Sequence, residues 1–288
     1  MSFAYPPMER AGIFMSSGDE LEKARGVILG APLDDTGSFR PGTRFAPLSI
    51  RAVSSALEEY SINLGRDLRD ISFFDAGDFV LPPGNTITSL DTIARGVSAF
   101  INKGKMPFIL GGEHTVTLGA VQGCLSKYKE ITVIFIDAHA DMRPSYGGVI
   151  QSHASVAYLL QQLKGVTIYQ FGLRSADREE MALINREKVF KYRVAEPLTE
   201  ILPLLEGSPL YITIDMDVVD PAFAPGVAAP EPGGISSGEL LNIFPLLEAV
   251  KGQIIALDLV EICPPYDYSQ ITALLGAKII REALLTFL

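Results

Sequence analysis

The sequence predicts an α/β fold in which a mainly parallel β-sheet is covered by helices on both faces. Short apolar segments alternate with amphipathic segments along the whole 288-residue chain. Several short segments, such as ITVIFI at 131–136 and QIIALDLV at 253–260, are apolar almost throughout. Such runs are typical of strands buried on both faces, and strands that alternate with helices favour βαβ units.

Each expected strand is a short apolar run, and each expected helix is a longer amphipathic segment. In chain order, strands are expected at Val27–Ala31, Ile71–Asp75, Pro107–Leu110, Ile131–Asp137, Val166–Phe171, Leu210–Asp215 and Ile254–Val260, with a weaker one at Val189–Val194. Helices are expected at Pro47–Tyr60, Ser89–Lys103, Thr115–Lys129, His153–Leu163, Ser236–Val250 and Gln270–Thr286. A helix over Pro197–Leu205 should end or kink at Pro203, because proline lacks the N–H that a helix interior needs.

No repeat, low-complexity tract or clear linker interrupts this series, so we expect a single domain over residues 1–288. Two stretches rich in glycine and proline, Arg40–Pro47 and Asp220–Gly234, are too short to be linkers. We expect them to be ordered loops near a site.

The composition is that of a globular protein, with 48% hydrophobic and 20% charged residues. No apolar run reaches the roughly 18 residues that span a membrane, and the first ten residues lack a secretory signal pattern. The two cysteines, Cys124 and Cys263, form no disulfide framework, so a cytoplasmic location is expected. The net charge of −10, without basic clusters, argues against nucleic-acid binding. It would attract a small cation, although acidity also serves solubility alone.

Acidic and histidine side chains follow four of the expected strands, at the carboxyl ends where parallel sheets bind ligands. These segments are Gly111-Gly112-Glu113-His114, Asp137-Ala138-His139-Ala140-Asp141, Asp215-Met216-Asp217 and Glu261. Residues two apart in an extended chain point the same way, so one segment can aim several ligands at one point. Each segment alone would also suit a solvated loop. Because all three histidines, His114, His139 and His153, lie in or beside the set, we predict a metal site.

The chemistry of this set favours two cations. Crowded carboxylates repel one another, and divalent cations would remove the cost of burying them. The candidate ligands are His114, Asp137, His139, Asp141, Asp215 and Asp217. They are too many for one ion that keeps an open position. Carboxylates and imidazoles without a thiolate favour Mn²⁺ over Fe²⁺, Co²⁺, Ni²⁺ or Zn²⁺. Two neighbouring ions can generate a hydroxide near neutral pH.

The motifs GGEH at 111–114, DAHAD at 137–141 and IDMDVVDPAFAPG at 214–226 resemble the three metal-binding signatures of the arginase/agmatinase (ureohydrolase) family. The likeness is closest to bacterial agmatinases, and it extends to RPG at 40–42 and DLVE at 258–261. It implies a three-layer α/β/α sandwich around a mainly parallel, eight-stranded sheet, the arginase-like fold. It also implies a metal-dependent hydrolase of linear amidines, forming a homo-oligomer, either a trimer or a hexamer.

The resemblance further implies two Mn²⁺ ions per chain. One would be held by His114, Asp137, Asp141 and Asp215, and the other by Asp137, His139, Asp215 and Asp217, with Asp137 and Asp215 bridging. It implies that His153 is a catalytic histidine and that Glu261 binds a guanidinium group. The chemistry agrees, because a carboxylate accepts a guanidinium bidentately. Asp141 is suited to relay a proton, and His153 can shuttle one to a leaving amine.

The substrate expected from the resemblance is agmatine, cut to putrescine and urea in polyamine biosynthesis. Guanidinobutyrase, guanidinopropionase, arginase and formimidoylglutamase activities are alternatives. Arg143 stands where arginases carry an asparagine for the amino acid end, which disfavours arginine. Agmatine has a positive charge at each end and suits an acidic cleft. Arg143 would select a guanidino acid only if it faced the distal pocket, and we expect it to point to solvent instead.

Three departures from the family pattern leave every candidate metal ligand in place. Ala140 replaces a usual threonine, Ala154 replaces a usual glycine, and Val227–Ala229 replaces Thr-Gly-Thr. They bear on the substrate rather than on the reaction. A non-catalytic metal-binding assembly protein is an alternative of another class, which the presence of His153 and Glu261 disfavours. A dinuclear phosphoesterase would need more histidine or asparagine ligands.

Overall fold

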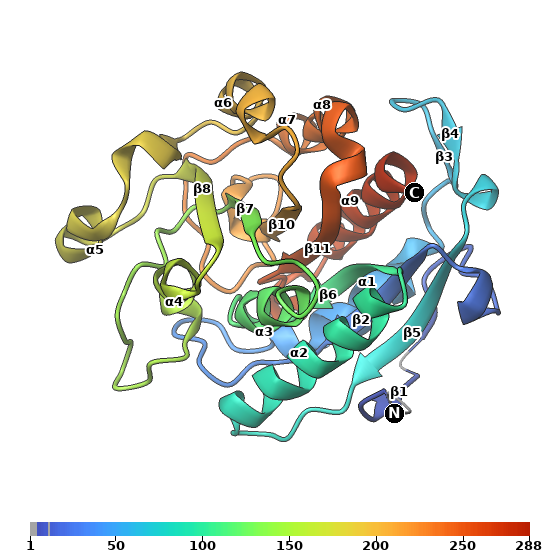
Figure 1. The fold of residues 1–288 in the computed structure, drawn as a ribbon, viewed down its shortest axis with the longest axis horizontal. Coiled ribbons are helices and arrows are strands. Elements are labelled where there is room, and N and C mark those ends of the chain that lie inside the picture. The colour runs from blue at the N-terminus through green and yellow to red at the C-terminus, as the bar shows by residue number, and fades with distance from the viewer. Residues whose placement is uncertain (1–4, 11) are drawn as a thin grey trace.

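A nine-stranded sheet forms the centre of the fold, in the order β1-β5-β2-β6-β11-β10-β7-β8-β9 (Figure 1). The structure is a computed structural model and describes residues 5–10 and 12–288. The strands are β1 (Met8–Glu9), β2 (Gly26–Ala31), β5 (Phe73–Phe79), β6 (Met106–Gly111), β7 (Ile131–Ile136), β8 (Val166–Leu173), β9 (Val189–Lys191), β10 (Leu210–Asp215) and β11 (Ile254–Val260). A separate hairpin pairs β3 (Tyr60–Ser61) with β4 (Arg66–Asp67).

The eight strands that the sequence predicts all lie in this sheet and run parallel, which confirms the mainly parallel sheet, although the sheet has nine strands rather than eight. A ninth strand, β1, pairs antiparallel with β5 at the edge. It has only two residues, so no periodic pattern could have indicated it.

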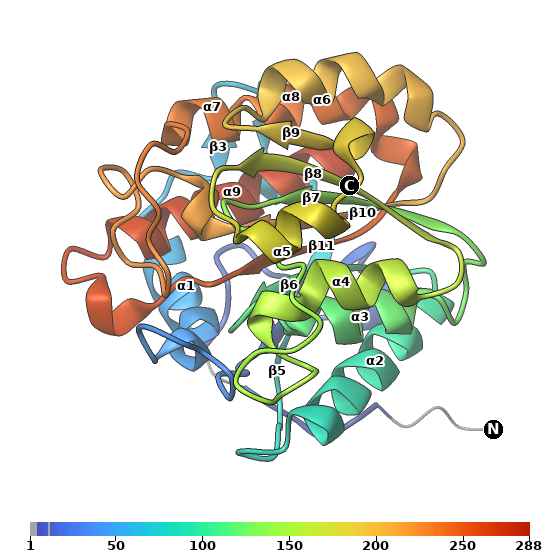
Figure 2. The ribbon, with the colours of Figure 1, turned by 90° about the vertical axis from the view of Figure 1, so that its left-hand side faces the viewer.

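Helices cover both faces of the sheet. They are α1 (Ala46–Ser54), α2 (Thr86–Asn102), α3 (Val116–Cys124), α4 (Val156–Gln162), α5 (Arg178–Leu183), α6 (Ala195–Ile201), α7 (Ser237–Leu241), α8 (Ile243–Leu247) and α9 (Ile271–Phe287). Figure 2 shows α6 and α8 on one side of the sheet and α2, α3 and α4 on the other. Among the described residues, no helix is both long and apolar enough to cross a membrane.

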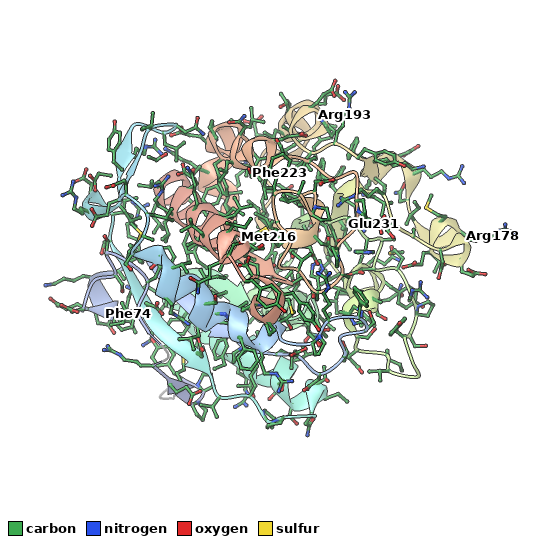
Figure 3. All side chains as sticks on the ribbon, turned by 180° about the vertical axis from the view of Figure 1, so that it is seen from behind. Phe74, Arg178, Arg193, Met216, Phe223 and Glu231 are labelled. Atoms are coloured by element: carbon green, nitrogen blue, oxygen red, sulfur yellow. The ribbon has the colours of Figure 1, made fainter. Side chains whose placement is uncertain are left out.

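Successive strand residues pack alternately into two hydrophobic cores, one on each face of the sheet. Along β7, Ile134 and Ile136 pack into the core beneath α1, α6, α8 and α9, whereas Val133 and Phe135 pack into the core beneath α2, α3 and α4. This alternation is what a doubly covered strand requires, and it explains the continuous apolar runs. In Figure 3, Met216 lies within the dense centre of the molecule, whereas Arg178 and Arg193 extend from its periphery.

Several helix boundaries differ from the expected ones. The expected helix 47–60 ends at Ser54, because the chain then turns into the β3–β4 hairpin. The expected helix 236–250 is divided into α7, α8 and a 3₁₀ turn. Pro245 lies in α8 and cannot donate to the carbonyl of Leu241, where α7 ends. The expected break near Pro203 is present, since α6 ends at Ile201.

Helix α5 was not expected. Asp177 and Glu180 form a capping box at its start, the one local signal that could have indicated it.

Candidate active site

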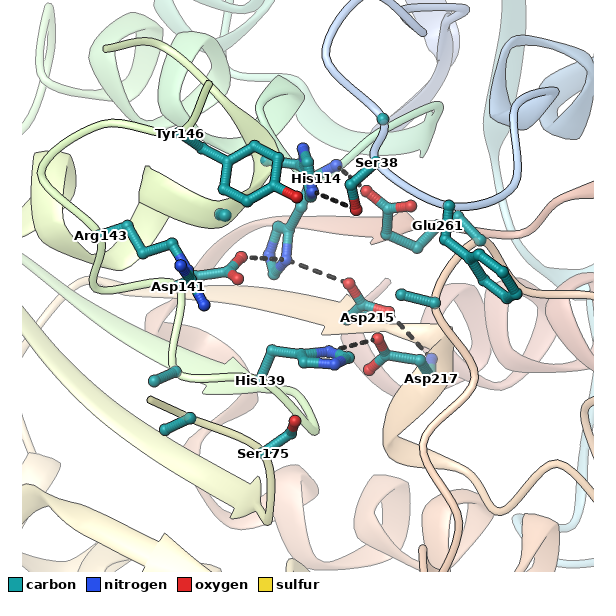
Figure 4. A pocket seen from close by; sticks show the side chains of 18 of the residues that line it. Ser38, His114, His139, Asp141, Arg143, Tyr146, Ser175, Asp215, Asp217 and Glu261 are labelled. Carbon is teal, nitrogen blue, oxygen red and sulfur yellow. Dashed lines mark hydrogen bonds and ion pairs between the residues drawn. The ribbon is translucent and has the colours of Figure 1, made fainter. Parts of the chain in front are cut away.

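The predicted metal ligands and Glu261 converge at the carboxyl ends of four adjacent strands, β6, β11, β10 and β7, and His153 joins them from the turn before α4. All of them except Asp137 line a cavity of about 190 Å³. Figure 4 shows the side chains of His114, Asp141, Asp215 and Asp217 directed toward one another. The expected cluster at one edge of the sheet is therefore present, and it brings together segments up to 147 residues apart.

His114 faces three carboxylates. Its Nδ1 lies 3.1 Å from Asp137 Oδ2, 3.3 Å from Asp141 Oδ2 and 3.2 Å from Asp215 Oδ2. Within the described residues, neither His114 Nδ1 nor Asp137 Oδ2 has a hydrogen-bond partner, although both are buried. Buried polar atoms are nearly always paired, so unpaired ligand atoms that face one another fit a bound cation. The ring of His114 is held from behind, where Nε2 lies 3.0 Å from Thr213 Oγ1.

A second group shares Asp137 with the first. The ligand atoms of His114, Asp137 and Asp141 lie within 4.8 Å of one another, and so do those of Asp137, His139 and Asp217. In the second group, His139 Nδ1 lies 2.8 Å from Asp217 Oδ2 and 3.8 Å from Asp137 Oδ1. Two groups with a common carboxylate, built from imidazole and carboxylate alone, fit two neighbouring divalent cations.

The electrostatics show why the cluster suits cations. Burial, with Asp217 and Asp141 nearby, raises the pKa of Asp137 to about 7. Burial, with Asp217 and Asp137, raises the pKa of Asp215 well above its ordinary value. Burial opposes protonation of His139, but Asp217 and Asp137 outweigh it and raise its pKa to about 11. Without cations, protons must therefore neutralise part of the cluster.

Backbone geometry positions two of these side chains. Asp141 and Glu261 have φ values of 50° and 65°, in the left-handed region that non-glycine residues rarely adopt. Gly112 is needed for a different reason. A Cβ at Gly112 would lie 2.0 Å from the carbonyl oxygen of Leu33, which accepts the Glu113 N–H at 2.8 Å. No pattern in the sequence indicates the two left-handed residues.

Glu261 is anchored rather than solvated. One carboxylate oxygen, Oε1, accepts the backbone N–H of His114 at 2.6 Å, and the residue also lines the cavity. Burial raises the pKa of Glu261 well above its ordinary value, and Glu113 adds to the effect. A positively charged group entering the cavity would favour its ionised form.

His153 lies in the same cavity, in a 3₁₀ turn before α4. Its ring meets that of Tyr146 edge to face, with centroids 5.4 Å apart. Its two ring nitrogens face the hydroxyl groups of Thr36 and Ser38, each at 3.2 Å. Neither hydroxyl was singled out from the sequence, because both belong to a loop far from every metal motif.

Arg143 pairs with acids rather than simply pointing to solvent. Its Nη2 lies 3.1 Å from Asp177 Oδ2, and its Nε lies 3.6 Å from Glu180 Oε2. All three residues line the cavity, as do Ala154, Ala228 and Ala229, three of the positions that depart from the family pattern. Ala140 also lines it. The departures thus alter the cavity wall and leave the ligand groups intact.

The chain matches the model of the arginase family over residues 24–286. It is 45% identical to an agmatinase of Bacillus subtilis (strain 168) over 278 residues, which are 96% of each chain. It is also similar to the crystal structure of agmatine ureohydrolase of Thermoplasma volcanium. The TM-score is 0.86 at 33% identity, over 96% of this chain and 94% of the other.

A guanidinobutyrase of Pseudomonas aeruginosa is less similar, at 29% identity over 94% of this chain and 88% of that protein. The full-length match of family, motifs and fold agrees with the ligand groups found at the sheet edge. The chain therefore belongs to the arginase family of metal-dependent ureohydrolases.

Proposed function

We propose that this protein hydrolyses agmatine to putrescine and urea, using two bound manganese ions. The observation that carries the proposal is the pair of ligand groups that share Asp137, with the anchored carboxylate of Glu261 in the same cavity. The agmatinases among its relatives support agmatine as the substrate. The oxygen and nitrogen ligands, without thiolate, support manganese.

The two groups of converging ligand atoms support the proposed ligand sets, to which Asp215 is added through its proximity to His114. His114, Asp137, Asp141 and Asp215 would hold one ion, and Asp137, His139, Asp215 and Asp217 the other. Asp137 belongs to both groups of converging atoms, which supports a bridging role. When bound, two such ions supply a hydroxide nucleophile near neutral pH and stabilise the charge that develops in the reaction.

Three side chains of the chain itself have roles in this proposal. Glu261 binds the guanidinium, since its acceptor-only carboxylate matches a planar fork of N–H donors. Asp141 accepts a proton at its carboxylate and relays it. His153 delivers a proton to the nitrogen that becomes the leaving amine, and takes another from solvent.

The cavity wall that Arg143, Asp177 and Glu180 form favours a cationic substrate. Arg143 carries one positive charge, but Asp177 and Glu180 beside it carry two negative charges. This wall is therefore net acidic, and it would attract the distal ammonium of agmatine rather than the carboxylate of a guanidino acid. The same pairing leaves Arg143 little capacity to select an anion.

A substrate panel tests the proposal. Urea release from agmatine, guanidinobutyrate and arginine is measured with manganese and with chelator, in the parent and in Arg143→Ala. We expect manganese-dependent activity that is highest with agmatine. The preference for agmatine over guanidinobutyrate should change by less than about tenfold in the variant. A parent that prefers guanidinobutyrate, and loses that preference in Arg143→Ala, would identify a guanidino acid as the substrate and Arg143 as its selector.

The proposal extends to the domain organisation, the oligomeric state and the cellular location of the enzyme. We propose one domain over residues 1–288, a homo-oligomer, either a trimer or a hexamer, and a cytoplasmic location. Sedimentation analysis of the purified protein measures the oligomeric state directly. A monomer at working concentration would contradict it.

A further inference from the structure

The hydroxyl of Thr36 connects His153 to the turn that carries His114. Thr36 Oγ1 lies 2.9 Å from Glu113 Oε1, 3.0 Å from the backbone nitrogen of His153 and 3.2 Å from His153 Nδ1. Glu113 directly precedes His114 and is buried, with 1% of its surface exposed. One hydroxyl group thus meets three polar atoms, and its single proton can serve only one of them.

Glu113 determines where that proton goes. Its Oε2 accepts the backbone N–H groups of Asp35 and Thr36 at 2.8 and 2.7 Å. Its Oε1 accepts the hydroxyl of Thr115 at 2.7 Å and faces the hydroxyl of Thr36 at 2.9 Å. A carboxylate surrounded by four donors acts as an acceptor at every contact, so the Thr36 hydroxyl donates to Glu113.

The remaining lone pairs of Thr36 Oγ1 must then accept. One accepts the backbone N–H of His153, which can act only as a donor. The other faces His153 Nδ1, which can complete the hydrogen bond only if Nδ1 carries a proton. The neutral imidazole of His153 is therefore protonated at Nδ1 and unprotonated at Nε2.

We propose that Thr36, held by Glu113, is a positioning residue that fixes His153 in the Nδ1–H tautomer. The inference rests on the proposed function, in which His153 shuttles a proton. In this tautomer Nε2, which faces the hydroxyl of Ser38 at 3.2 Å, keeps a free lone pair to take a proton and later release it. Ser38 also lines the cavity, so the active nitrogen of His153 lies on the substrate side.

In this arrangement, the turn at Glu113 and His114 serves both the metal site and the proton shuttle His153. The backbone of Glu113 and His114 aims a metal ligand into the cavity, and the side chain of Glu113 orients the proton shuttle from behind. Removing the Thr36 hydroxyl would leave Glu113 with three donors and His153 with no fixed acceptor at Nδ1. The ring would then be free to adopt the Nε2–H tautomer that an isolated histidine side chain prefers.

The test is ¹⁵N NMR of histidine-labelled protein loaded with diamagnetic Zn²⁺, because the chain has only three histidines. The signals of His153 are assigned by their loss in His153→Asn. We expect the parent to show a protonated Nδ1 and an unprotonated Nε2 when His153 is neutral. Thr36→Val, which keeps the shape of the side chain, should shift His153 toward the Nε2–H form, and Thr36→Ser should restore the parent spectrum.

Kinetics of the manganese enzyme give the second readout. In Thr36→Val, kcat for agmatine should fall at least about tenfold while KM changes less than about twofold, because proton transfer and not binding is impaired. Thr36→Ser should recover most of the rate. Thr199→Val is the matched control, since Thr199 is an exposed residue of α6 whose hydroxyl donates to the Ala195 carbonyl of its own helix. Its spectrum and rate should match those of the parent.

A parent spectrum with Nε2–H at His153 would overturn the proposal whatever the activity. So would an unchanged tautomer in Thr36→Val. If Thr36→Val does not fold, Thr36→Ala gives the same two readouts. A parent that has the predicted tautomer but releases no urea from any guanidino compound would contradict the proposed function and still support the tautomer assignment.

Discussion

Glu261 shows which properties of a single site residue can be predicted from the sequence and which cannot. Its place directly after β11 was predictable, because an acid at the carboxyl end of a buried strand reaches the ligand edge of the sheet. Its φ of 65° and its hydrogen bond to the backbone N–H of His114 were not predictable. Both depend on a neighbouring strand that lies far away in the sequence. The identity of the site residues could be predicted from the sequence, whereas the backbone conformation and hydrogen bonds that hold them in place could be seen only in the fold.

Replacing Glu261 tests its assignment as the guanidinium ligand. Glu261→Gln removes the charge and keeps the shape, so kcat/KM for agmatine should fall. A charge-assisted hydrogen bond contributes about 1.5–3 kcal/mol, which corresponds to roughly 10- to 100-fold. Elemental analysis should find unchanged manganese, because Glu261 is not among the proposed metal ligands. Glu206→Gln, at an exposed position, is the control. Loss of metal in Glu261→Gln would reassign the residue as a ligand.

At the scale of elements, burial decided which boundaries the sequence could predict. Strands β7, β10 and β11 match their apolar runs because both faces are covered. Strand β5 was expected to end at Asp75 but continues to Phe79 through Asp75, Gly77 and Asp78. These polar residues look like a strand end. They are accommodated inside because Arg51 of α1 forms ion pairs with both Asp75 and Asp78. These residues are 24 and 27 positions away in the sequence, so no local pattern reveals the pairing.

The Arg51 cluster should therefore contribute strongly to stability. Its guanidinium binds Asp75 through two nitrogens, at 2.7 and 2.9 Å, and also donates to Asp78 and the Gly77 carbonyl. Arg51→Met would leave two buried carboxylates without their cation, so the free energy of unfolding should fall by about 3–5 kcal/mol. The matched control is Arg95→Met, which breaks an exposed ion pair with Asp91 and should cost less than about 1 kcal/mol. Urea unfolding followed by circular dichroism measures both, and equal losses would refute a special role for the cluster.

At the scale of the whole molecule, the site occupies the rim between the two hydrophobic cores. The strands whose ends carry it lie in the middle of the sheet, with apolar layers on each face. This arrangement excludes water from Asp137, Asp215 and Asp217, of which 2%, 3% and 2% is exposed. The same burial that gives the fold its stability thus places several carboxylates where they repel one another. Metal binding should accordingly be coupled to the stability of the entire chain.

Removing metal should lower the thermal stability, and the loss should grow as the pH rises. In the metal-free chain, burial and the nearby Asp217 and Asp141 raise the pKa of Asp137 from 3.8 to about 7. Between these values the folded state holds a proton that the unfolded state lacks, so stability falls as the pH increases. His139 acts in the same direction. Burial opposes its protonation, but Asp217 outweighs burial and raises its pKa from 6.5 to about 11, so its stabilising contribution fades across that range.

Bound cations reverse this dependence, because they require deprotonated ligands and bind more tightly as the pH rises. The measurement is Tm of manganese-saturated and chelator-treated protein between about pH 6 and about pH 8, where Asp137 loses its proton in the folded chain and His139 loses its proton in the unfolded chain. The difference between the two Tm values should widen steadily toward the higher pH. Asp217→Asn, which removes both a ligand and the main partner of His139, should narrow that difference. A gap that stays constant across the range would show that protons and metal ions do not compete for these side chains.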